Sequence, residues 1–202
     1  MIIGLTGSIG AGKTTVSKRL CELGALILDA DVFARQAVEP GSKGLDEIVR
    51  LFGPGMLRQD GTFNRAAMAA AVFADEQKRM ILNGILHPLV LEKMKKSTLQ
   101  SRGEQPERPV VWDVPLLIES GWAGQVDVVW LVTAERETRI ARIIRRDGCT
   151  RAQAEARISA QMPDEEKRRY ADEILINDGD TAQLLAQVNA LYAGMIAKGA
   201  EA

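Results

Sequence analysis

The stretch GLTGSIGAGKTTVSKRL, residues 4–20, decides the fold class. It contains G-x-x-x-x-G-K-[ST], the pattern of a loop whose backbone cradles nucleotide phosphates. The defining residues are Gly7, Gly12, Lys13 and Thr14. The apolar run at 2–6 predicts a buried strand before the loop, and the helical spacing at 14–24 predicts a helix after it. This strand–loop–helix context is the one in which the pattern holds a triphosphate.

Each part of the loop has a physical role in binding phosphate. Glycines let backbone N–H groups approach phosphate oxygens, and the helix N-terminus adds partial positive charge. Lys13 supplies a full charge, and the Thr14 hydroxyl can coordinate Mg²⁺. The residues expected to contact the nucleotide here are Gly7, Ser8, Gly10, Ala11, Gly12, Lys13, Thr14 and Thr15.

Four further apolar runs predict strands that alternate with helices. They are ALILD (25–29), VVWDV (110–114), VDVVWLVT (126–133) and EILIN (173–177). Apolar strands alternating with helices are typical of a parallel sheet covered on both faces. We therefore expect an α/β fold with three α/β/α layers.

The middle of the chain predicts a helical insertion. Residues 39–100 contain no convincing strand, and Pro88 should kink or break the long helical pattern there. Residues 101–109 (SRGEQPERP) predict a polar linker back into the sheet. The expected division is a nucleotide-binding core (1–38, 110–138 and 172–202), an acceptor-binding insertion with its linker (39–109) and an arginine-rich lid (139–171).

Composition narrows the class of protein. The chain has 202 residues, 46% hydrophobic, enough for one domain with an insertion, and its net charge of −1 gives no reason to expect nucleic-acid binding. Cys21 and Cys149 form no metal pattern, and Cys21 is expected to be a small buried group. With no secretory signal and no membrane-spanning run, we expect a reduced, cytoplasmic protein with no obligate protein partner.

The loop alone is shared by switches, motors and kinases. The N-K-x-D tetrapeptide of guanine-specific switches does not occur, and the chain is short for a motor. A helical insertion and late arginines favour a small-molecule kinase. A nucleotide-dependent regulator without an acceptor is the competing class.

The late arginines lie in ERETRIARIIRRDG. Ile140, Ile143 and Ile144 share one helical face, and the arginines gather opposite, at Arg139, Arg142, Arg145 and Arg146. One interpretation is a solvated basic face paired with Glu135 and Glu137. The other is a lid that closes over ATP and stabilises the transferring phosphoryl group, where an arginine contributes about 10³–10⁵ in rate.

Three further residues carry open alternatives. Asp31 follows the second strand, at the end of the sheet where α/β proteins bind ligands. It either accepts the proton of an attacking hydroxyl, orients that hydroxyl, or caps the next helix. Asp113 ends the third strand and has a choice between Mg²⁺, substrate and cap. His87 is the single histidine, which excludes a zinc site with several histidines. For His87 itself, a structural role beside Pro88 is favoured over contact with a substrate.

Taken together, the motifs resemble those of the dephospho-coenzyme A kinases. They occur in the family's order over about residues 3–179, as LTGSIGAGKTT, DADVFAR, DGTFNR, ILHPLV, DVPLLIESG, RRDGCTRAQAEARISAQM and ADEILINDG. The resemblance implies a P-loop kinase core with a five-stranded parallel sheet, a helical substrate domain and a lid. It also implies that ATP phosphorylates the ribose 3′-hydroxyl of dephospho-coenzyme A, giving coenzyme A and ADP.

The resemblance also implies roles for individual residues. Asp31 becomes the general base or the group that orients the hydroxyl, and Asp113 belongs to the floor of the site. The acceptor side would include Arg35, Arg65 and His87; Asn177 would lie near the adenine; and the lid would include Arg139, Arg142 and Arg146. Ser8 and Phe33 depart slightly from the family pattern, at positions that should not remove a phosphate contact. Another small-molecule kinase, for a nucleoside monophosphate or a sugar, would use the same core.

Overall fold

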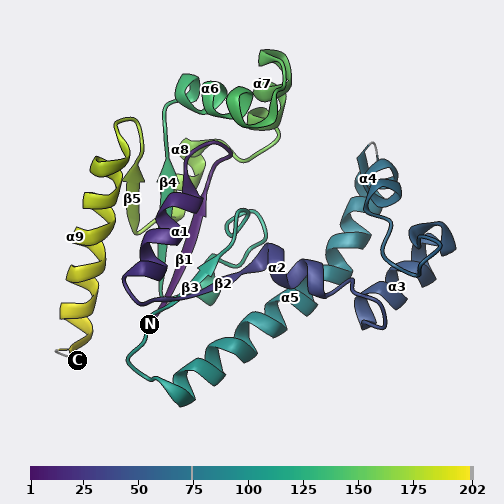
Figure 1. The fold of residues 1–202 in the computed structure, drawn as a ribbon, viewed down its shortest axis with the longest axis horizontal. Helices are drawn as coiled ribbons and strands as arrows, with labels where there is room; N and C mark the ends of the chain where they lie inside the picture. The colour runs from purple at the N-terminus through teal and green to yellow at the C-terminus, as the bar shows by residue number, and fades with distance from the viewer. Residues whose placement is uncertain (74, 201–202) are drawn as a thin grey trace. The chain divides into compact units, whose positions relative to one another are not determined.

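Short apolar runs form the central sheet. The computed structural model describes residues 1–73 and 75–200. Five strands form one parallel sheet in the order β2-β3-β1-β4-β5 (Figure 1). Their bounds are β1 Ile2–Gly7, β2 Leu26–Asp29, β3 Val110–Asp113, β4 Val128–Thr133 and β5 Glu173–Ile176. The prediction of an α/β fold with five parallel strands is confirmed.

The burial of the central strands explains their composition. All four residues of β3 are buried, which a strand reaches only where both faces of the sheet are covered. Two helices, α1 (Lys13–Glu22) and α9 (Thr181–Ala200), pack on one face. Val16 and Leu20 of α1 share a core with Leu184 and Val188 of α9 and with side chains from the strands. This apolar contact fixes α1, and with it the start of the helix that follows the phosphate loop.

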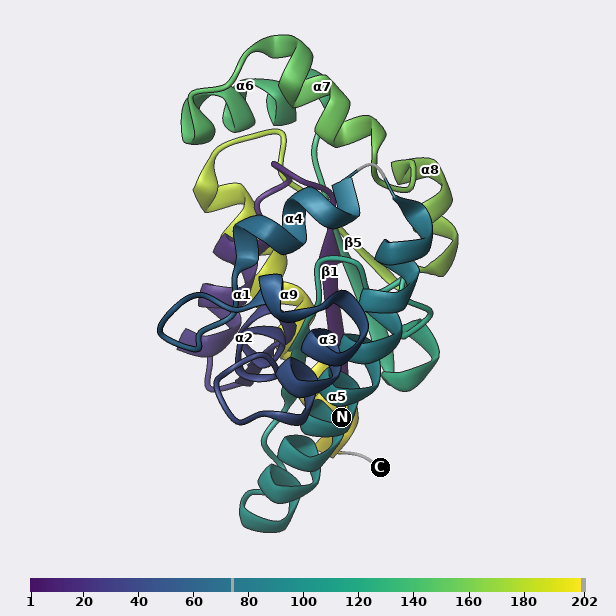
Figure 2. The ribbon, with the colours of Figure 1, turned by 90° about the vertical axis from the view of Figure 1, so that its right-hand side faces the viewer.

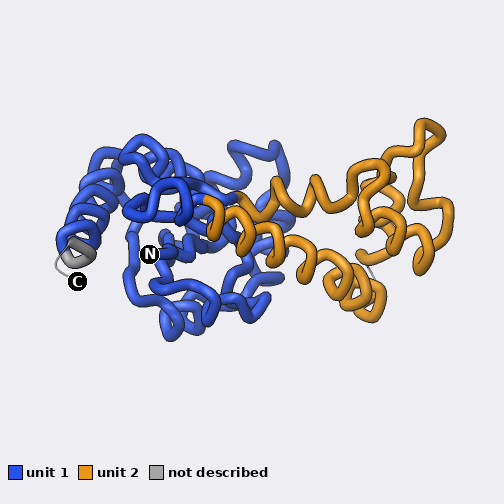
Figure 3. Tube along the Cα trace, turned by 90° about the horizontal axis from the view of Figure 1, so that it is seen from below, with its two compact units in different colours: residues 1–28, 101–202 blue, residues 29–100 orange. Residues whose placement is uncertain are grey.

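The chain divides into two compact units (Figure 3). Unit 1 comprises residues 1–28 and 101–202, and unit 2 comprises residues 29–100. Besides the sheet, unit 1 contains α6 (Arg136–Asp147), α7 (Arg151–Ser159) and the short α8 (Asp164–Lys167). The finer division into core, insertion and lid stays a prediction.

Unit 2 is helical. It contains α2 (Ala30–Gln36), α3 (Lys43–Phe52), α4 (Arg65–Phe73) and most of α5 (Glu76–Glu104), which Figure 2 shows from the side. Its own core is built around Val38, Ile48 and Met68. A short 3-10 turn at Pro54–Met56 and a single bridge between Leu57 and Phe63 complete the connection from α3 to α4.

The proline in α5 does not break the helix. The expected interruption at Pro88 is wrong, because α5 runs without a gap for 29 residues. Proline removes one N–H and crowds the carbonyl four residues earlier, which here belongs to Gly84, a residue with an adaptable backbone. Val90 and Met94 are buried just beyond the proline, so tertiary packing holds the helix on that side. The helix also covers residues 101–104 of the expected linker.

One cysteine of α1 lies at the surface. Cys21 is exposed, so the expectation of a buried thiol is wrong. It follows Leu20 by one position on α1, about 100° around the helix from a side chain that faces the sheet.

No helix among the described residues combines the length and the apolar composition that crossing a bilayer requires.

Candidate active site

The phosphate loop joins β1 to α1 through two left-handed glycines. Gly10 has φ +81° and Gly12, the N-cap of α1, has φ +100°. A β-carbon at Gly10 would lie 2.9 Å from the carbonyl oxygen of Arg139, and one at Gly12 would collide with the side-chain amide of Asn177. Both positions therefore require glycine for conformation and for space. The backbone of α1 begins at Lys13, so its unpaired N–H groups face the loop.

Lys13 and Asp113 are brought together by the sheet. The Lys13 Nζ donates to Oδ1 of Asp113, and the two side chains are only 18% and 8% exposed. Asp113 ends β3, which pairs directly with β1 and places Asp113 opposite Leu5. Of the alternatives for Asp113, its position beside Lys13 favours a role in the phosphate site over a helix cap.

Asn177 holds the loop from the opposite side. It follows β5, is buried, and its Nδ2 donates to the carbonyl of Ala11 at 2.7 Å. Its backbone N–H donates to Thr133 at 2.9 Å, which continues the β4–β5 pairing. The amide therefore fixes the phosphate-loop backbone, a role that sequence analysis did not assign. The expected position near the adenine stays a prediction.

Four of the five arginines of α6 were candidates for the site, and they lie in different environments. Arg139 is buried and forms an ion pair with Asp164 at 3.3 Å. Arg142 donates to the carbonyl of Gly10 and to Oδ1 of Asn177, each at 3.4 Å. Arg142 therefore contacts the phosphate loop directly, and Arg139 pairs with a residue that itself binds the loop.

The two outer arginines have other neighbours. Arg145 lines a hollow of about 410 Å³ over one face of α6, together with Thr138, Ala141 and Arg142. Arg146 pairs with its neighbour Asp147 at 2.7 Å, and this hydrogen bond lowers the pKa of the Asp147 carboxyl. The structure does not bring Arg146 to the loop, and its catalytic role stays a prediction.

Sequence reasoning missed several residues that contact the site. Asp164 accepts hydrogen bonds from the Ser8 hydroxyl and, at 2.8 Å, from the Thr133 hydroxyl. Gln161 accepts from the Ile9 backbone N–H at 2.8 Å. For Asp164 the signal was the charged run PDEEK, which suggests a helix start but says nothing about a contact more than 150 residues away.

A buried ion pair anchors the other end of α8. Lys167 is fully buried, and its Nζ lies 2.7 Å from Oε1 of Glu119, without the alignment of a hydrogen bond. Glu119 belongs to the segment VPLLIE that directly follows β3. Within unit 1, α8 therefore joins the phosphate loop to this segment through its two charged ends.

Unit 2 contains the remaining candidates. The cap of α2 is Asp29, whose Oδ1 accepts from the N–H groups of Asp31 at 2.8 Å and Val32 at 3.3 Å. The capping alternative for Asp31 is therefore wrong, since the preceding carboxylate performs it. Arg35 lies in the last turn of α2, and the Arg65 guanidinium lies over the Phe63 ring at 5.7 Å.

His87 lies in α5 directly before Pro88 and is partly buried. Burial lowers its pKa from the ordinary value of 6.5, because the protonated form loses hydration. Burial therefore favours the neutral imidazole. Its contact with the acceptor stays a prediction.

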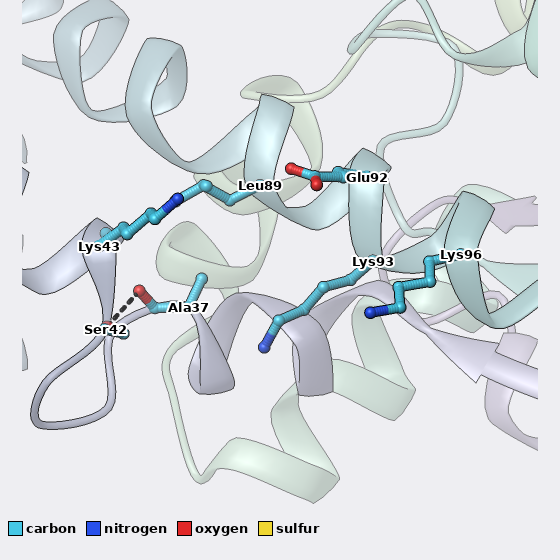
Figure 4. Close-up of a pocket in the computed structure, with 8 residues that line it drawn as sticks. Ala37, Ser42, Lys43, Leu89, Glu92, Lys93 and Lys96 are labelled. Atoms are coloured by element: carbon cyan, nitrogen blue, oxygen red, sulfur yellow. Dashed lines mark hydrogen bonds between the residues drawn. The ribbon is translucent and has the colours of Figure 1, made fainter.

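Unit 2 also has a pocket of about 290 Å³, shown in Figure 4. Lysines from α3 and α5 line it, with Ala37 and Leu89 as apolar walls, and the Ser42 hydroxyl donates to Ala37 across one edge at 2.8 Å. The lining residues of α5 are Leu89, Glu92, Lys93 and Lys96. At 3.6 residues per turn they lie about 140–240° around the helix from His87. The pocket therefore lies on a different face of α5 from His87, the candidate residue for binding the acceptor substrate.

The fold and the site together define a P-loop kinase: a parallel sheet, a phosphate loop at the end of β1, and arginines of α6 on that loop. The chain matches the family model CoaE, dephospho-CoA kinase, over residues 1–183. It belongs to the dephospho-CoA kinase family.

Individual relatives agree with this assignment. The chain is 48% identical to the dephospho-CoA kinase of Symbiobacterium thermophilum, over 95% of this chain and 80% of that protein. Among solved structures, TT1252 from Thermus thermophilus aligns with a TM-score of 0.80 and 36% identity, over 96% of this chain and 97% of the other. The dephospho-CoA kinase from Campylobacter jejuni has the same fold, with a TM-score of 0.75 and 24% identity over 98% of each chain.

Proposed function

We propose that this protein transfers the γ-phosphate of ATP to the ribose 3′-hydroxyl of dephospho-coenzyme A, giving coenzyme A and ADP, the last step of coenzyme A synthesis. The observation that carries the proposal is the cluster of Lys13, Asp113, Arg139 and Arg142 at a phosphate loop, in a chain of the dephospho-CoA kinase family. The reaction forms an O–P bond at the 3′ position and breaks the bond between the β-phosphate oxygen and the γ-phosphorus.

On the donor side, the loop backbone and Lys13 bind the phosphates. Phosphoryl transfer spreads negative charge over the γ-phosphate oxygens, so cationic groups placed in advance stabilise the transition state. Lys13 and the arginines of α6 supply that charge, and in the proposal Arg146 joins them when the nucleotide is bound. Partial burial of Lys13 strengthens its interaction with phosphate, because less water screens it.

Two residues beside the phosphate loop fit a magnesium ion. Mg²⁺ prefers hard oxygen ligands and takes one or two from the protein, with phosphates and water completing the shell. The Thr14 hydroxyl, at the start of α1, and the Asp113 carboxylate, at the end of β3, are such ligands in unit 1. When bound, Mg²⁺ would neutralise charge on the β- and γ-phosphates.

On the acceptor side, Asp31 accepts the proton of the 3′-hydroxyl or orients that hydroxyl. The cap of α2 is Asp29, so capping does not account for Asp31. Arg35, Arg65 and His87 contact dephospho-coenzyme A in this proposal. The supporting observation is that all four belong to one compact unit, residues 29–100.

The test is an acceptor screen. ADP release is measured with Mg-ATP and dephospho-coenzyme A, AMP, CMP, adenosine or gluconate, and ³¹P NMR gives the position of the new phosphate. We expect rapid turnover of dephospho-coenzyme A alone, with the product phosphorylated at the 3′ position. Turnover of a different acceptor would overturn the proposed substrate, and ATP binding without acceptor-dependent ADP release would indicate a regulator.

A further inference from the structure

We infer that Asp164 is a positioning residue for the phosphate donor: its carboxylate orients the Arg139 guanidinium and the Ser8 side chain of the phosphate loop. The inference deepens the proposed function by adding a residue that acts through others. It rests on the proposed function only for the identity of the acceptor, since the nucleotide site lies within unit 1.

Both oxygens of the Asp164 carboxylate are used. Oδ1 accepts from the Ser8 hydroxyl and lies 3.3 Å from Arg139 Nη1, and Oδ2 accepts from the Thr133 hydroxyl at 2.8 Å. Because Thr133 ends β4, one contact fixes the carboxylate to the rigid sheet. The other oxygen then holds a residue of α6 and a residue of the loop.

Arg139 depends on this partner. Its side chain is 9% exposed, and among the described residues its Nε has no hydrogen-bond partner. A buried guanidinium with an unused donor is costly unless a further acceptor arrives. Its backbone lies against Gly10, so the side chain starts directly over the phosphate loop. A phosphate oxygen of ATP is the acceptor that this position fits.

The segment before Asp164 is also attached to the loop. Gln161 accepts from the Ile9 N–H, and the Ile9 side chain packs into the small core that joins α6 and α7, made by Ile140, Ile143 and Ala154. The α6–α8 region therefore rests on two consecutive loop residues, Ser8 and Ile9. A change at Asp164 should reach the bound phosphates through the loop as well as through Arg139.

The Asp164 carboxylate lies beside a phosphate site, where a negative charge is unfavourable. Alone, it would repel the triphosphate; paired with Arg139, it leaves little net charge while fixing the direction of the guanidinium. A purely structural role as a helix cap does not account for it, since Asp164 lies inside α8 and Pro163 is the N-cap.

The test uses Asp164→Asn, which keeps the size of the side chain and one of its two acceptor oxygens but removes the charge that orients Arg139. We expect the KM for ATP to rise about tenfold, a change of about 1.4 kcal/mol in binding. The KM for dephospho-coenzyme A should stay unchanged. Calorimetry of ATP binding without the acceptor should show the same tenfold loss of affinity for ATP. Glu165→Gln is the matched control, an exposed acid next in the same helix, and should bind ATP as the wild type does.

Two further variants separate positioning from folding. Thr133→Val removes the anchor of Asp164 without touching Arg139 or the loop, and should raise the KM for ATP about threefold. Arg139→Gln should itself weaken ATP binding, and adding Asp164→Asn to it should give little further loss. A lower melting temperature with unchanged ATP affinity in both Asp164→Asn and Thr133→Val, or additive losses in the double variant, would overturn the inference.

The calorimetric measurement keeps the two proposals apart. If the wild type binds ATP but does not phosphorylate dephospho-coenzyme A, the proposed function fails, while weaker ATP binding by Asp164→Asn still supports the inference. If turnover is as proposed and ATP affinity is unchanged in the variant, the inference fails alone.

Discussion

The Lys13 ammonium forms a salt bridge with Asp113, a residue 100 positions later in the chain, because β1 and β3 are neighbours in the sheet. The phosphate-loop lysine therefore has an anionic partner within unit 1, and both side chains are mostly buried. Two groups that the proposed reaction needs, a cation for the phosphates and a hard oxygen for Mg²⁺, are held side by side.

Replacing Lys13 should remove most of the turnover. We expect Lys13→Ala to lower kcat about 10²–10³-fold, as loss of one preorganised charge does. Steady-state kinetics at saturating ATP measure this. Lys18→Ala, an exposed lysine of the same helix, is the matched control. A kcat for Lys13→Ala within threefold of the control would contradict the role of Lys13 at the phosphates.

Asp29 and Asp31 should separate into a stability role and a chemical role. Asp29→Ala removes the cap of α2 and should lower the free energy of unfolding by about 1 kcal/mol. Asp31→Asn should leave stability nearly unchanged and lower kcat about 10²–10⁴-fold. Urea unfolding and kinetics on both variants test the pair. Near wild-type turnover in Asp31→Asn would exclude the base role.

Asn177 should matter for the shape of the loop. Asn177→Ala leaves the carbonyl of Ala11 without its donor, and we expect a loss of about 1–3 kcal/mol in stability together with weaker ATP binding. Asn177→Asp should bind ATP more weakly still, because a carboxylate would face that carbonyl and repel phosphate. Asn189→Ala, an exposed asparagine of α9, serves as the control. Equal ATP affinity in the alanine and aspartate variants would argue against this repulsion.

The Lys167–Glu119 pair should show the cost of an unpaired buried charge. Glu119→Gln strands a fully buried ammonium, and we expect a loss of about 3–5 kcal/mol in unfolding free energy, toward the lower value because Glu119 is 20% exposed. The double variant Glu119→Gln, Lys167→Met should recover much of that loss, because no charge stays buried. Urea unfolding measures both, with Glu166→Gln of α8 as the control. No recovery in the double variant would mean that packing, not charge, dominates there.

His87 should make stability depend on pH in a stated direction. Because its pKa in the folded protein is lowered below 6.5, the unfolded chain binds a proton first as the pH falls. The stability that neutral His87 contributes is present above pH 6.5 and is lost as the pH falls from there toward the folded-state pKa. Melting temperatures between pH 8 and 5 should therefore fall more steeply for the wild type than for His87→Gln. Parallel curves would show that His87 does not titrate in this way.

Much of the fold could be predicted because its signals are local. Runs such as VVWD and VVWLVT specify buried strands within a few residues, and the glycine pattern specifies the loop that follows β1. Expectations based on residue type were misleading in two places. Pro88 lies within an unbroken helix because neighbouring turns are packed, and Cys21 is exposed because it lies one position past the sheet-facing stripe of α1.

What the sequence by itself determined is therefore the set of strands, the phosphate loop and the family to which its motifs belong. Only the tertiary structure decided which side chains hold that loop. Asp164 reaches Ser8 across 156 residues and Asn177 reaches Ala11 across 166, and no local pattern specifies either contact. The physical reason is that strand order in a parallel sheet differs from sequence order, so the ends of β1, β3, β4 and β5 meet only after the sheet has formed.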